Sequence, residues 1–271
     1  MNLNELINYL NGKYYISRLD IIKKLSMIEK KDIIEYMFSD PFISEKNVEK
    51  LEKNIKGYPI EYLVNEVQFL NNIFYIDERV LIPRVETEDL VLIAKKIIEE
   101  KNIKKILDLG TGSGVIAITL KKFFPDIEII ASDISFEALE VFKKNCKKNN
   151  VNIKSYLGSY LEPFLKEHEQ IDLIISNPPY VEEEYKNKNE TLKYEPDIAL
   201  FAGKDGQNFY RKLINKYYDL IKNKTLLFET TEFNVLKTYD LIDKLSGKTE
   251  IKKDSFGIER FIYHYKNSHK D

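Results

Sequence analysis

Apolar residues among the first sixty positions recur at the spacing of amphipathic helices. They are Leu3, Leu6, Ile7 and Leu10, followed by Leu19, Ile22 and Leu25. Residues three and four apart lie on one face of a helix, so each group predicts a buried stripe. Ser39-Asp40-Pro41 breaks the pattern and Gly57-Tyr58-Pro59 ends it, because proline and glycine interrupt helices. We therefore expect a small helical domain over residues 1–64.

The next segment has the pattern of extended chain. Two apolar runs cover residues 67–70 and 73–76. Between them lies Asn71-Asn72, and asparagine tolerates the positive φ that a tight turn requires. A further extended run at 80–83 precedes a helix that begins near Glu86. Residues 65–84 are therefore expected to form a β-hairpin linker that follows the helical domain.

From Lys104 onward, strand and helix patterns alternate, which is typical of a mostly parallel sheet with helices on both faces. The strand candidates are residues 105–109, 127–132, 152–157, 171–176, 224–229, 248–253 and 258–264. Only residues 254–257 separate the last two, so these strands are expected to pair antiparallel. The prediction is an α/β fold over residues 85–271 with a Rossmann-like, seven-stranded, mostly parallel sheet. Residues 181–205 carry little regular pattern, and so long a loop in a compact domain is usually functional.

Charge and composition narrow the classes of protein that this fold can be. The 271 residues carry a formal net charge of -2, which argues against a protein held on nucleic acid by bulk charge. A single cysteine, Cys146, permits no disulfide within the chain, and a reducing cytoplasm fits. His168, His264 and His269 lack metal-ligand spacing, so we expect no metal site. The sequence shows no signal peptide and no apolar stretch of membrane-spanning length, so no membrane association is expected.

A glycine-rich turn joins the first strand of the sheet to the helix after it. Its residues are Gly110, Thr111, Gly112, Ser113 and Gly114. Glycines let the backbone pass close to a ligand, and a helix N-terminus offers free N–H groups. Asp108 precedes the turn, where a carboxylate would repel a pyrophosphate but suit the cationic amino-acid end of S-adenosylmethionine. An ordinary strand-to-helix turn stays as an alternative, and so does a dinucleotide turn, although its usual spacing is G-x-G-x-x-G.

Asp133 follows the next strand, about 20 residues beyond the glycine turn. A carboxylate at this distance is placed to accept hydrogen bonds from two ribose hydroxyls. The alternative is a helix N-cap, a role that Ser135 could also fill. The turn and the carboxylate together indicate adenosine binding, which neither would indicate alone.

The most specific motif is Asn177-Pro178-Pro179-Tyr180, directly after the strand candidate at 171–176. Open α/β sheets place their ligands at this carboxyl edge of the strands. The prolines fix the backbone, so the side-chain oxygen of Asn177 and the carbonyl oxygen of Pro178 become two fixed acceptors. They can hold both donors of a planar NH2 group and aim its nitrogen at a methyl donor, while Tyr180 stacks on the flat target. Positioning then supplies most of the catalysis, which indicates N-methyl transfer; a rigid turn without chemistry is the alternative.

Beyond these motifs, the chain resembles the protein-(glutamine-N5) methyltransferases that act on peptide-chain release factors, and the resemblance covers nearly all of it. Residues 80–88 read VLIPRVETE, close to that family's VLIPRPETE. Further matches are Glu61-Tyr62-Leu63, Phe69 with Phe74, the segment from Tyr194-Glu195-Pro196 to Phe209-Tyr210-Arg211, and Asp254, Gly257 and Arg260-Phe261-Ile262. The Asn-Pro-Pro-Tyr motif is shared with nucleic-acid N-methyltransferases, and these flanking segments narrow the family.

The resemblance implies a class I methyltransferase with S-adenosylmethionine as cofactor, which methylates a release-factor glutamine and supports translation termination. It implies that Tyr160 flanks the adenine and that residues 1–64 dock the release factor. The chain departs from the family at Asn65 and Asn71, which replace glycines, and at Ser159, which replaces an aspartate. The family's E-x-G-x-x-Q segment reads ETTEFN over residues 229–234.

Two other functions stay open. Adenine-N6 or guanine-N2 methylation of nucleic acid would also use a planar NH2 group. The charge balance and the acidic run Glu182-Glu183-Glu184 beside the motif disfavour it, and predict no stable binding of nucleic acid. A non-catalytic protein that binds S-adenosylmethionine is the other alternative, but it would not need an intact Asn-Pro-Pro-Tyr motif.

Overall fold

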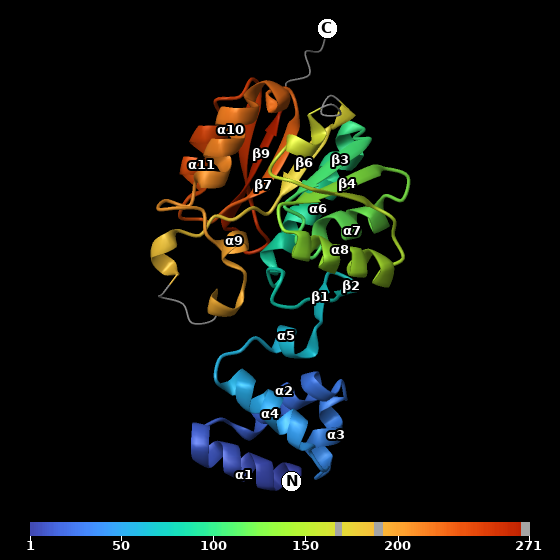
Figure 1. Ribbon diagram of the computed structural model, residues 1–271, viewed down its shortest axis with the longest axis vertical. Coiled ribbons are helices and arrows are strands. Elements are labelled where there is room, and N and C mark those ends of the chain that lie inside the picture. Colours follow the sequence, from blue (N-terminus) through green and yellow to red (C-terminus); the bar gives the residue numbers. More distant parts are fainter. Residues whose placement is uncertain (166–169, 187–191, 267–271) are drawn as a thin grey trace. The chain divides into compact units, whose positions relative to one another are not determined.

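The structure is a computed structural model that describes residues 1–165, 170–186 and 192–266 (Figure 1). Contacts between residues divide the chain into two compact units. The first contains Met1–Glu66 and Glu190–Tyr194, and the second contains Val67–Asn189 and Glu195–Asp271. A short segment from much later in the sequence therefore belongs to the helical unit. The predicted domain of residues 1–64 does not include this segment.

The first unit is built from short helices with side-chain caps. They are α1 (Leu3–Tyr14), α2 (Arg18–Glu29), α3 (Ile33–Phe38), α4 (Glu45–Ile55) and α5 (Ile60–Val64). Ser17, Asp32 and Ser44 each accept a backbone N–H from the first turn of the helix that follows, which satisfies donors without a partner inside the helix. The short 3-10 helix η4 (Leu192–Tyr194) joins this unit, where the ring of Tyr194 packs edge-on against Tyr58 at 4.9 Å between centroids.

The core of the first unit contains the expected apolar stripes, with one correction. Leu3, Leu6, Ile7 and Leu10 are buried as predicted. The buried residues of α2 are Ile21, Ile22, Leu25 and Ile28. Leu19 is 48% exposed, so its place in the second stripe was wrong. The series that ends at Ile28 spans two turns of one helix face, and this longer apolar series sets which side of α2 is buried.

A two-stranded hairpin begins the second unit, and its turn lies one residue earlier than predicted. The strands are β1 (Val67–Phe69) and β2 (Asn72–Phe74). The turn residues are Leu70, with φ 49°, and Asn71. Asn72 instead lies in the strand, because its buried side-chain oxygen accepts a hydrogen bond from Nζ of Lys122. Asn65, which replaces a glycine usual in the family, takes the left-handed conformation with φ 54°.

The main sheet has the seven strands that the sequence predicts. They are β3 (Lys105–Leu109), β4 (Glu128–Asp133), β5 (Lys154–Leu157), β6 (Leu173–Ser176), β7 (Thr225–Glu229), β8 (Lys248–Lys253) and β9 (Glu259–Tyr265). Their order across the sheet is β5-β4-β3-β6-β7-β9-β8. The first five of these run parallel, and β9 pairs antiparallel with both β7 and β8. The chain reverses its direction of winding between β3 and β6, which is where open α/β sheets bind ligands.

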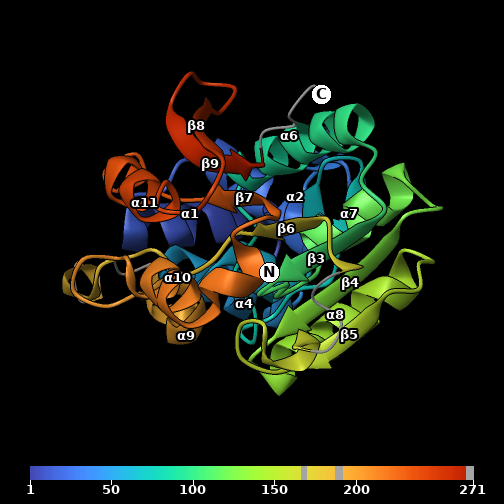
Figure 2. The ribbon, with the colours of Figure 1, turned by 90° about the horizontal axis from the view of Figure 1, so that it is seen from above.

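Helices cover both faces of this sheet. The longer ones are α6 (Glu86–Lys101), α7 (Val115–Phe123), α8 (Phe136–Lys148), α10 (Asn208–Ile221) and α11 (Val235–Ile242). Figure 2 shows α6 and α7 on one side of the sheet and α10 and α11 on the other. Successive strand residues point to opposite faces, so Leu226 and Phe228 pack with α10 and α11 while Leu227 packs with α6 and α7. Strands buried on both faces explain the nearly continuous apolar runs in the sequence.

Residues 80–83, which were expected to be extended, form no strand with another segment. Residues 181–205 were expected to carry little regular pattern. Within 181–205, the described part contains the short helices η3 (Glu183–Tyr185), η4 and α9 (Asp197–Leu200). The helices in the described ranges are too short or too polar to cross a lipid bilayer.

Candidate functional site

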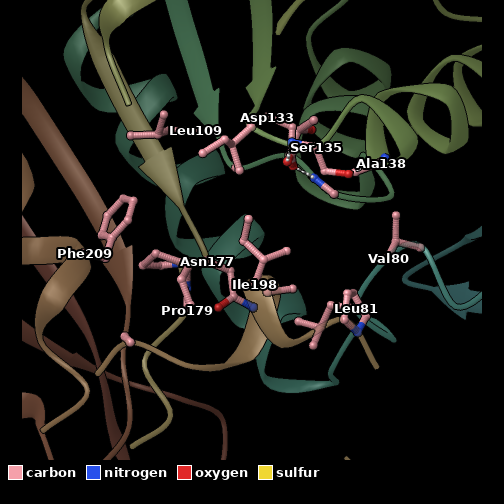
Figure 3. A pocket seen from close by; sticks show the side chains of 18 of the residues that line it. Val80, Leu81, Leu109, Asp133, Ser135, Ala138, Asn177, Pro179, Ile198 and Phe209 are labelled. Atoms are coloured by element: carbon pink, nitrogen blue, oxygen red, sulfur yellow. Dashed lines mark hydrogen bonds between the residues drawn. The ribbon is translucent and has the colours of Figure 1, made fainter. Parts of the chain in front are cut away.

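A cavity of about 440 Å3 opens at the carboxyl edge of the central strands (Figure 3). Its volume lies within the range that small-molecule and cofactor sites occupy. Sequence-predicted residues that line it are Gly110, Thr111, Gly112, Ser113, Asp133, Tyr160, Asn177, Pro178 and Pro179. Every lining residue belongs to the second unit. The strand order thus brings together predicted residues that lie up to about seventy positions apart in the sequence. Two other predicted residues, Gly114 and Tyr180, do not line the cavity.

The glycines of the turn have two different structural roles: Gly110 and Gly112 lie at the cavity, and Gly114 packs against a neighbouring helix. Gly110 and Gly112 have φ of 74° and 54°, and each would have open space around an added Cβ. They bring the backbone to the cavity wall in a conformation that other residues rarely adopt. Gly114 has φ 87°, and a Cβ there would lie 2.6 Å from Cδ2 of Phe142. Gly114 is therefore needed for the packing of α7 against α8, and its predicted contact with cofactor is not supported by the lining of the cavity.

Asp108 does not face the cavity, which corrects the expectation that it meets the cationic end of a ligand. Its side chain is fully buried, and Oδ2 accepts hydrogen bonds from Oγ1 of Thr111 at 2.6 Å and from the backbone N–H of Ala117 at 3.2 Å. Burial raises the pKa of this carboxyl to about 7. Asp108 therefore holds the glycine turn to the first turn of α7.

Asp133 lies on the cavity wall, at the end of β4. Its Oδ2 accepts the N–H of Gly112 at 2.8 Å, and its Oδ1 accepts the N–H of Ser135 at 2.9 Å. Ser135 itself caps α8, since its Oγ accepts the N–H of Ala138. Burial raises the pKa of Asp133, while the backbone donors act against that rise. Each carboxylate oxygen has a second lone pair, so both can accept a further hydrogen bond from a ligand.

Flat aromatic rings form another part of the wall. The ring of Tyr160 stacks on Phe209 at 5.2 Å and 22°, and on Tyr217 at 6.0 Å and 27°. Tyr160 and Phe209 both line the cavity, and Figure 3 shows Phe209 across it from Val80 and Leu81. Apolar faces of this kind suit a planar heterocycle. Phe209 belongs to a segment that resembles the family, but no local pattern in the sequence assigns it to the cavity wall.

The segment before α6 and the segment before α9 form one wall, although the sequence separates them widely. Oε2 of Glu195 accepts the N–H of Ile82 at 2.9 Å, and Oε1 pairs with Nη2 of Arg84 at 2.5 Å. The carboxylate of Glu195 is almost completely buried, so these bonds are strong. They place apolar lining residues from both segments beside the motif, namely Val80, Leu81, Pro83, Pro196, Ile198 and Ala199.

The Asn-Pro-Pro-Tyr motif continues from β6 to the cavity. Nδ2 of Asn177 donates to Oγ1 of Thr87 at 2.9 Å, which leaves the side-chain oxygen as the group that can accept from a ligand. The hydroxyl of Tyr180 donates to Oε1 of Glu229 at 3.1 Å. Burial and the negative charge of Glu229 raise the pKa of Tyr180 well above its usual value. Tyr180 is thus anchored beside the cavity, and the expectation that it stacks on the target is not supported.

Metal binding has no support in the described part of the chain. No group of three or more acidic, histidine or cysteine side chains there could hold an ion. His264 is buried in β9, with Nδ1 2.9 Å from Oγ1 of Thr249, and His168 and His269 lie outside the described residues. Cys146 is buried in α8.

The sheet order, the cavity at its switch point and the Asn-Pro-Pro-Tyr turn define a class I methyltransferase, whose methyl donor is S-adenosylmethionine. The family model for the methyltransferase small domain matches residues 90–193. The release factor glutamine methyltransferase of Dictyoglomus turgidum is 37% identical over 236 residues, which cover 84% of this chain and 84% of that protein. That of Flavobacterium psychrophilum is 40% identical, over 75% of this chain and 74% of that protein. The chain belongs to the release factor glutamine methyltransferase family.

Solved structures confirm the fold alone. The catalytic domain of hMettl16 in complex with the MAT2A 3′UTR hairpin 1 has a TM-score of 0.59 at 14% identity, and the match covers 92% of this chain and 91% of that one. The T. thermophilus 16S rRNA N2 G1207 methyltransferase, in complex with AdoMet and guanosine, has a TM-score of 0.54 at 16% identity. That match covers 74% of this chain and 50% of the other.

Proposed function

We propose that this chain transfers a methyl group from S-adenosylmethionine to the side-chain nitrogen of a glutamine in a peptide-chain release factor, and thereby supports translation termination. The observation that carries the proposal is the fixed side-chain amide of Asn177 at the cavity wall. Its donor side is occupied by Thr87, so its acceptor side is available for an NH2 group. The release factor as substrate follows the names of the curated relatives.

The residues of the cavity fit S-adenosylmethionine. Asp133 offers one carboxylate oxygen to each of two ribose hydroxyls, and the rings of Tyr160 and Phe209 offer a flat wall for the adenine. The backbone at Gly110 and Gly112 lies open to the amino-acid end of the cofactor. When bound, the cofactor supplies an electrophilic methyl group on a sulfonium, which is a good leaving group.

The chain's own contribution to the reaction is to hold and orient the glutamine amide. An amide NH2 is planar and a weak nucleophile, because its lone pair is delocalised. The side-chain oxygen of Asn177 and the carbonyl oxygen of Pro178 can accept its two protons, which directs the nitrogen toward the methyl group. Pro178 and Pro179 keep these acceptors fixed, so little entropy is lost on binding. The methylated nitrogen then releases a proton to water, and no strong base is required.

Charge favours a protein substrate over nucleic acid. The formal net charge is -2, and Glu183, in the acidic run after the motif, lines the cavity. A phosphate backbone would be repelled there. The structural neighbours that were solved with an RNA hairpin and with guanosine share the fold with this chain, but at 14–16% identity they carry no information about its substrate.

Transfer of tritium from labelled S-adenosylmethionine tests the proposal. Release factor, ribosomal RNA and duplex DNA are offered in parallel to the full-length protein. We expect label in release factor alone, and mass spectrometry of its peptides to place the methyl group on a glutamine. Label in nucleic acid with none in release factor would overturn the proposal.

Replacing Asp133 with alanine is expected to weaken S-adenosylmethionine binding by about ten- to a hundredfold. The loss of charge-assisted hydrogen bonds of this type costs roughly 1.5–3 kcal/mol. Calorimetry with the cofactor measures the affinity, and thermal unfolding without it shows whether the variant is folded. Because Asp133 also accepts the N–H of Gly112, Asp133→Asn serves as the variant of equal shape and should lose less affinity. An unchanged affinity in a folded Asp133→Ala protein would assign the ribose to another residue.

A further inference from the structure

Three strongly exposed apolar side chains lie beyond the same edge of the sheet as the cavity. Phe233 is 84% exposed, Phe256 72% and Val85 59%. Phe233 follows the end of β7, Phe256 lies in the turn between β8 and β9, and Val85 immediately precedes α6. These residues belong neither to the lining of the cavity nor to the hydrophobic cores. Together they are called the rim surface below.

The side chain of Arg260 joins two segments of the rim surface. Its Nη2 donates to Oε2 of Glu232, the residue before Phe233, at 2.9 Å. Its Nε donates to Oδ2 of Asp254, two residues before Phe256, at 2.8 Å. Arg260 and Asp254 are mostly buried, so these charge-assisted hydrogen bonds hold the two segments together.

A further hydrogen bond joins the turn between β8 and β9 to the first turn of α6. The backbone N–H of Ser255 donates to Oδ2 of Asp89 at 2.8 Å. Val85 lies about one helical turn before Asp89, or about 6 Å along the helix axis, and so beside this turn. Pro83 and Thr87, two residues to either side of Val85, line the cavity. The rim surface is therefore continuous with the cavity.

The rim surface lies within reach of a peptide whose glutamine is bound at Asn177. Strand β7 lies between β6 and β9, because Phe228 pairs with Ser176 on one side and with Ile262 on the other. Neighbouring strands are about 4.8 Å apart, so β9 lies about 10 Å from the end of β6 that carries Asn177. An extended peptide spans about 3.4 Å per residue, so residues about three positions from the target glutamine reach the rim surface.

We propose that the rim surface binds the polypeptide segment that carries the target glutamine, through apolar side chains on one side of that glutamine. The inference rests on the function proposed above, because it requires the glutamine to enter at the Asn-Pro-Pro-Tyr motif. That motif contacts the amide alone. Binding of the neighbouring residues of the substrate limits the positions that this amide can take, which favours its alignment with the methyl group.

Charge around the rim surface favours a polypeptide over nucleic acid. The carboxylates of Asp89, Glu232 and Asp254 lie in this cluster with the one guanidinium of Arg260. Three carboxylates and one guanidinium leave an excess of negative charge, which repels a phosphate backbone. Exposed aromatic side chains surrounded by polar groups are typical of surfaces that bind proteins.

Phe233→Ala combined with Phe256→Ala tests the inference on a synthetic release-factor peptide that extends about five residues to each side of the target glutamine. We expect KM for this peptide to rise on the order of tenfold, because two aromatic contacts are lost. The value of kcat at saturating peptide should change less than about twofold, since neither ring touches the reacting atoms. Calorimetry with S-adenosylhomocysteine should show an unchanged affinity, and thermal unfolding checks that the variant is folded.

Two matched variants control for the loss of exposed rings as such. Phe123→Ala removes an exposed phenylalanine at the end of α7. Helix α7 begins beyond the carboxyl end of β3 and runs back along the sheet, so Phe123 lies at the opposite edge and its variant should keep the wild-type KM. Phe233→Leu combined with Phe256→Leu keeps apolar side chains on the rim surface and should recover most of the lost affinity.

Fluorescence anisotropy of the labelled peptide gives a readout without turnover. With S-adenosylhomocysteine present, the double alanine variant should bind the peptide on the order of tenfold more weakly than the wild type. A labelled single-stranded RNA is measured in parallel, and we expect it to bind more weakly than the peptide.

The outcomes separate this inference from the proposed function. Equal KM and equal peptide affinity in the wild type and the double alanine variant would overturn the rim surface while glutamine methylation stands. A wild type that does not bind the peptide, or that binds RNA more tightly through these rings, would overturn it as well. If the wild type binds the peptide through the rings but transfers no methyl group to it or to intact release factor, the proposed function fails and the rim surface stands.

Discussion

Asn177→Ala is expected to lower kcat for release-factor methylation by about a hundredfold or more, with little change in thermal stability. The variant removes one of two acceptors that align the substrate amide, and a misplacement of about 1 Å can cost a hundredfold in rate. Stability should change little because Asn177 is partly exposed and makes one side-chain hydrogen bond, to Thr87. Single-turnover kinetics measures the rate, and thermal unfolding measures the stability.

Two further variants show whether Asn177 acts by geometry. Asn177→Gln keeps the amide but moves it by one methylene group, so it should be nearly as slow as Asn177→Ala. Asn177→Asp keeps an acceptor but loses the donor to Thr87 and adds a negative charge at the cavity wall, so it should also be slow. All three should bind S-adenosylhomocysteine with nearly wild-type affinity, because Asp133 and the glycine turn are unchanged. A turnover close to wild type in Asn177→Ala would remove Asn177 from the mechanism.

The sequence predicts the order and approximate bounds of the strands well, because the patterns that indicate them are local. Strand ends, the glycine turn and the double proline each act within a few residues, and β3 and β8 match their expected ranges. The hairpin turn differs by one residue because the side chain of Asn72 bonds Lys122, which is 50 positions away. Turn propensity contains no information on such a contact.

The site shows the same division between local and distant signals. Asp133 and Asn177 follow strand ends that the pattern locates, and both line the cavity. Thr87, in α6, lies 90 residues before its partner Asn177, and Glu229, in β7, lies 49 residues after its partner Tyr180, so both contacts depend on the tertiary fold. Asp108 was assigned to the ligand because it precedes the turn, but a buried strand position directs it to Thr111 instead. Long-range pairing and side-chain direction are the parts that a single sequence does not reveal.

Choice of one glutamine among many requires a surface beyond the cavity, because the motif contacts only a few atoms. We propose that the first unit supplies it. Helix α3 exposes Ile34, Met37 and Phe38, which lie three and four residues apart on one face, and Phe38 is 85% exposed. Phe42, shortly after the helix, is exposed as well. A cluster of exposed apolar side chains of this kind marks a protein-binding surface.

Deleting residues 1–64 is expected to abolish most methylation of intact release factor and to spare cofactor binding, because the residues that line the cavity belong to the second unit. The deletion also removes Tyr58, which packs against the ring of Tyr194, so it changes more than the docking surface. Point variants on that surface are therefore the sharper test. Phe38→Ala combined with Met37→Ala should raise KM for intact release factor about thirtyfold, since loss of a central aromatic contact costs roughly 2 kcal/mol. Thermal stability should stay within about 0.5 kcal/mol, because both side chains are exposed.

Two comparisons make this docking prediction specific. A short peptide that contains the target glutamine cannot use the α3 surface, so its kcat/KM should be equal for the wild type and the double variant. Tyr15→Ala is the control for an exposed aromatic side chain of the same unit, because Tyr15 is 91% exposed. Tyr15 follows the C-terminal end of α1, whereas Asn2, at the N-terminal end of α1, pairs with Phe42 beside the α3 surface. A helix of twelve residues separates the two places by about 18 Å. Equal KM for intact release factor in the wild type and the double variant would show that docking uses a different surface, and full activity of the protein without residues 1–64 would show that the helical unit has no part in it.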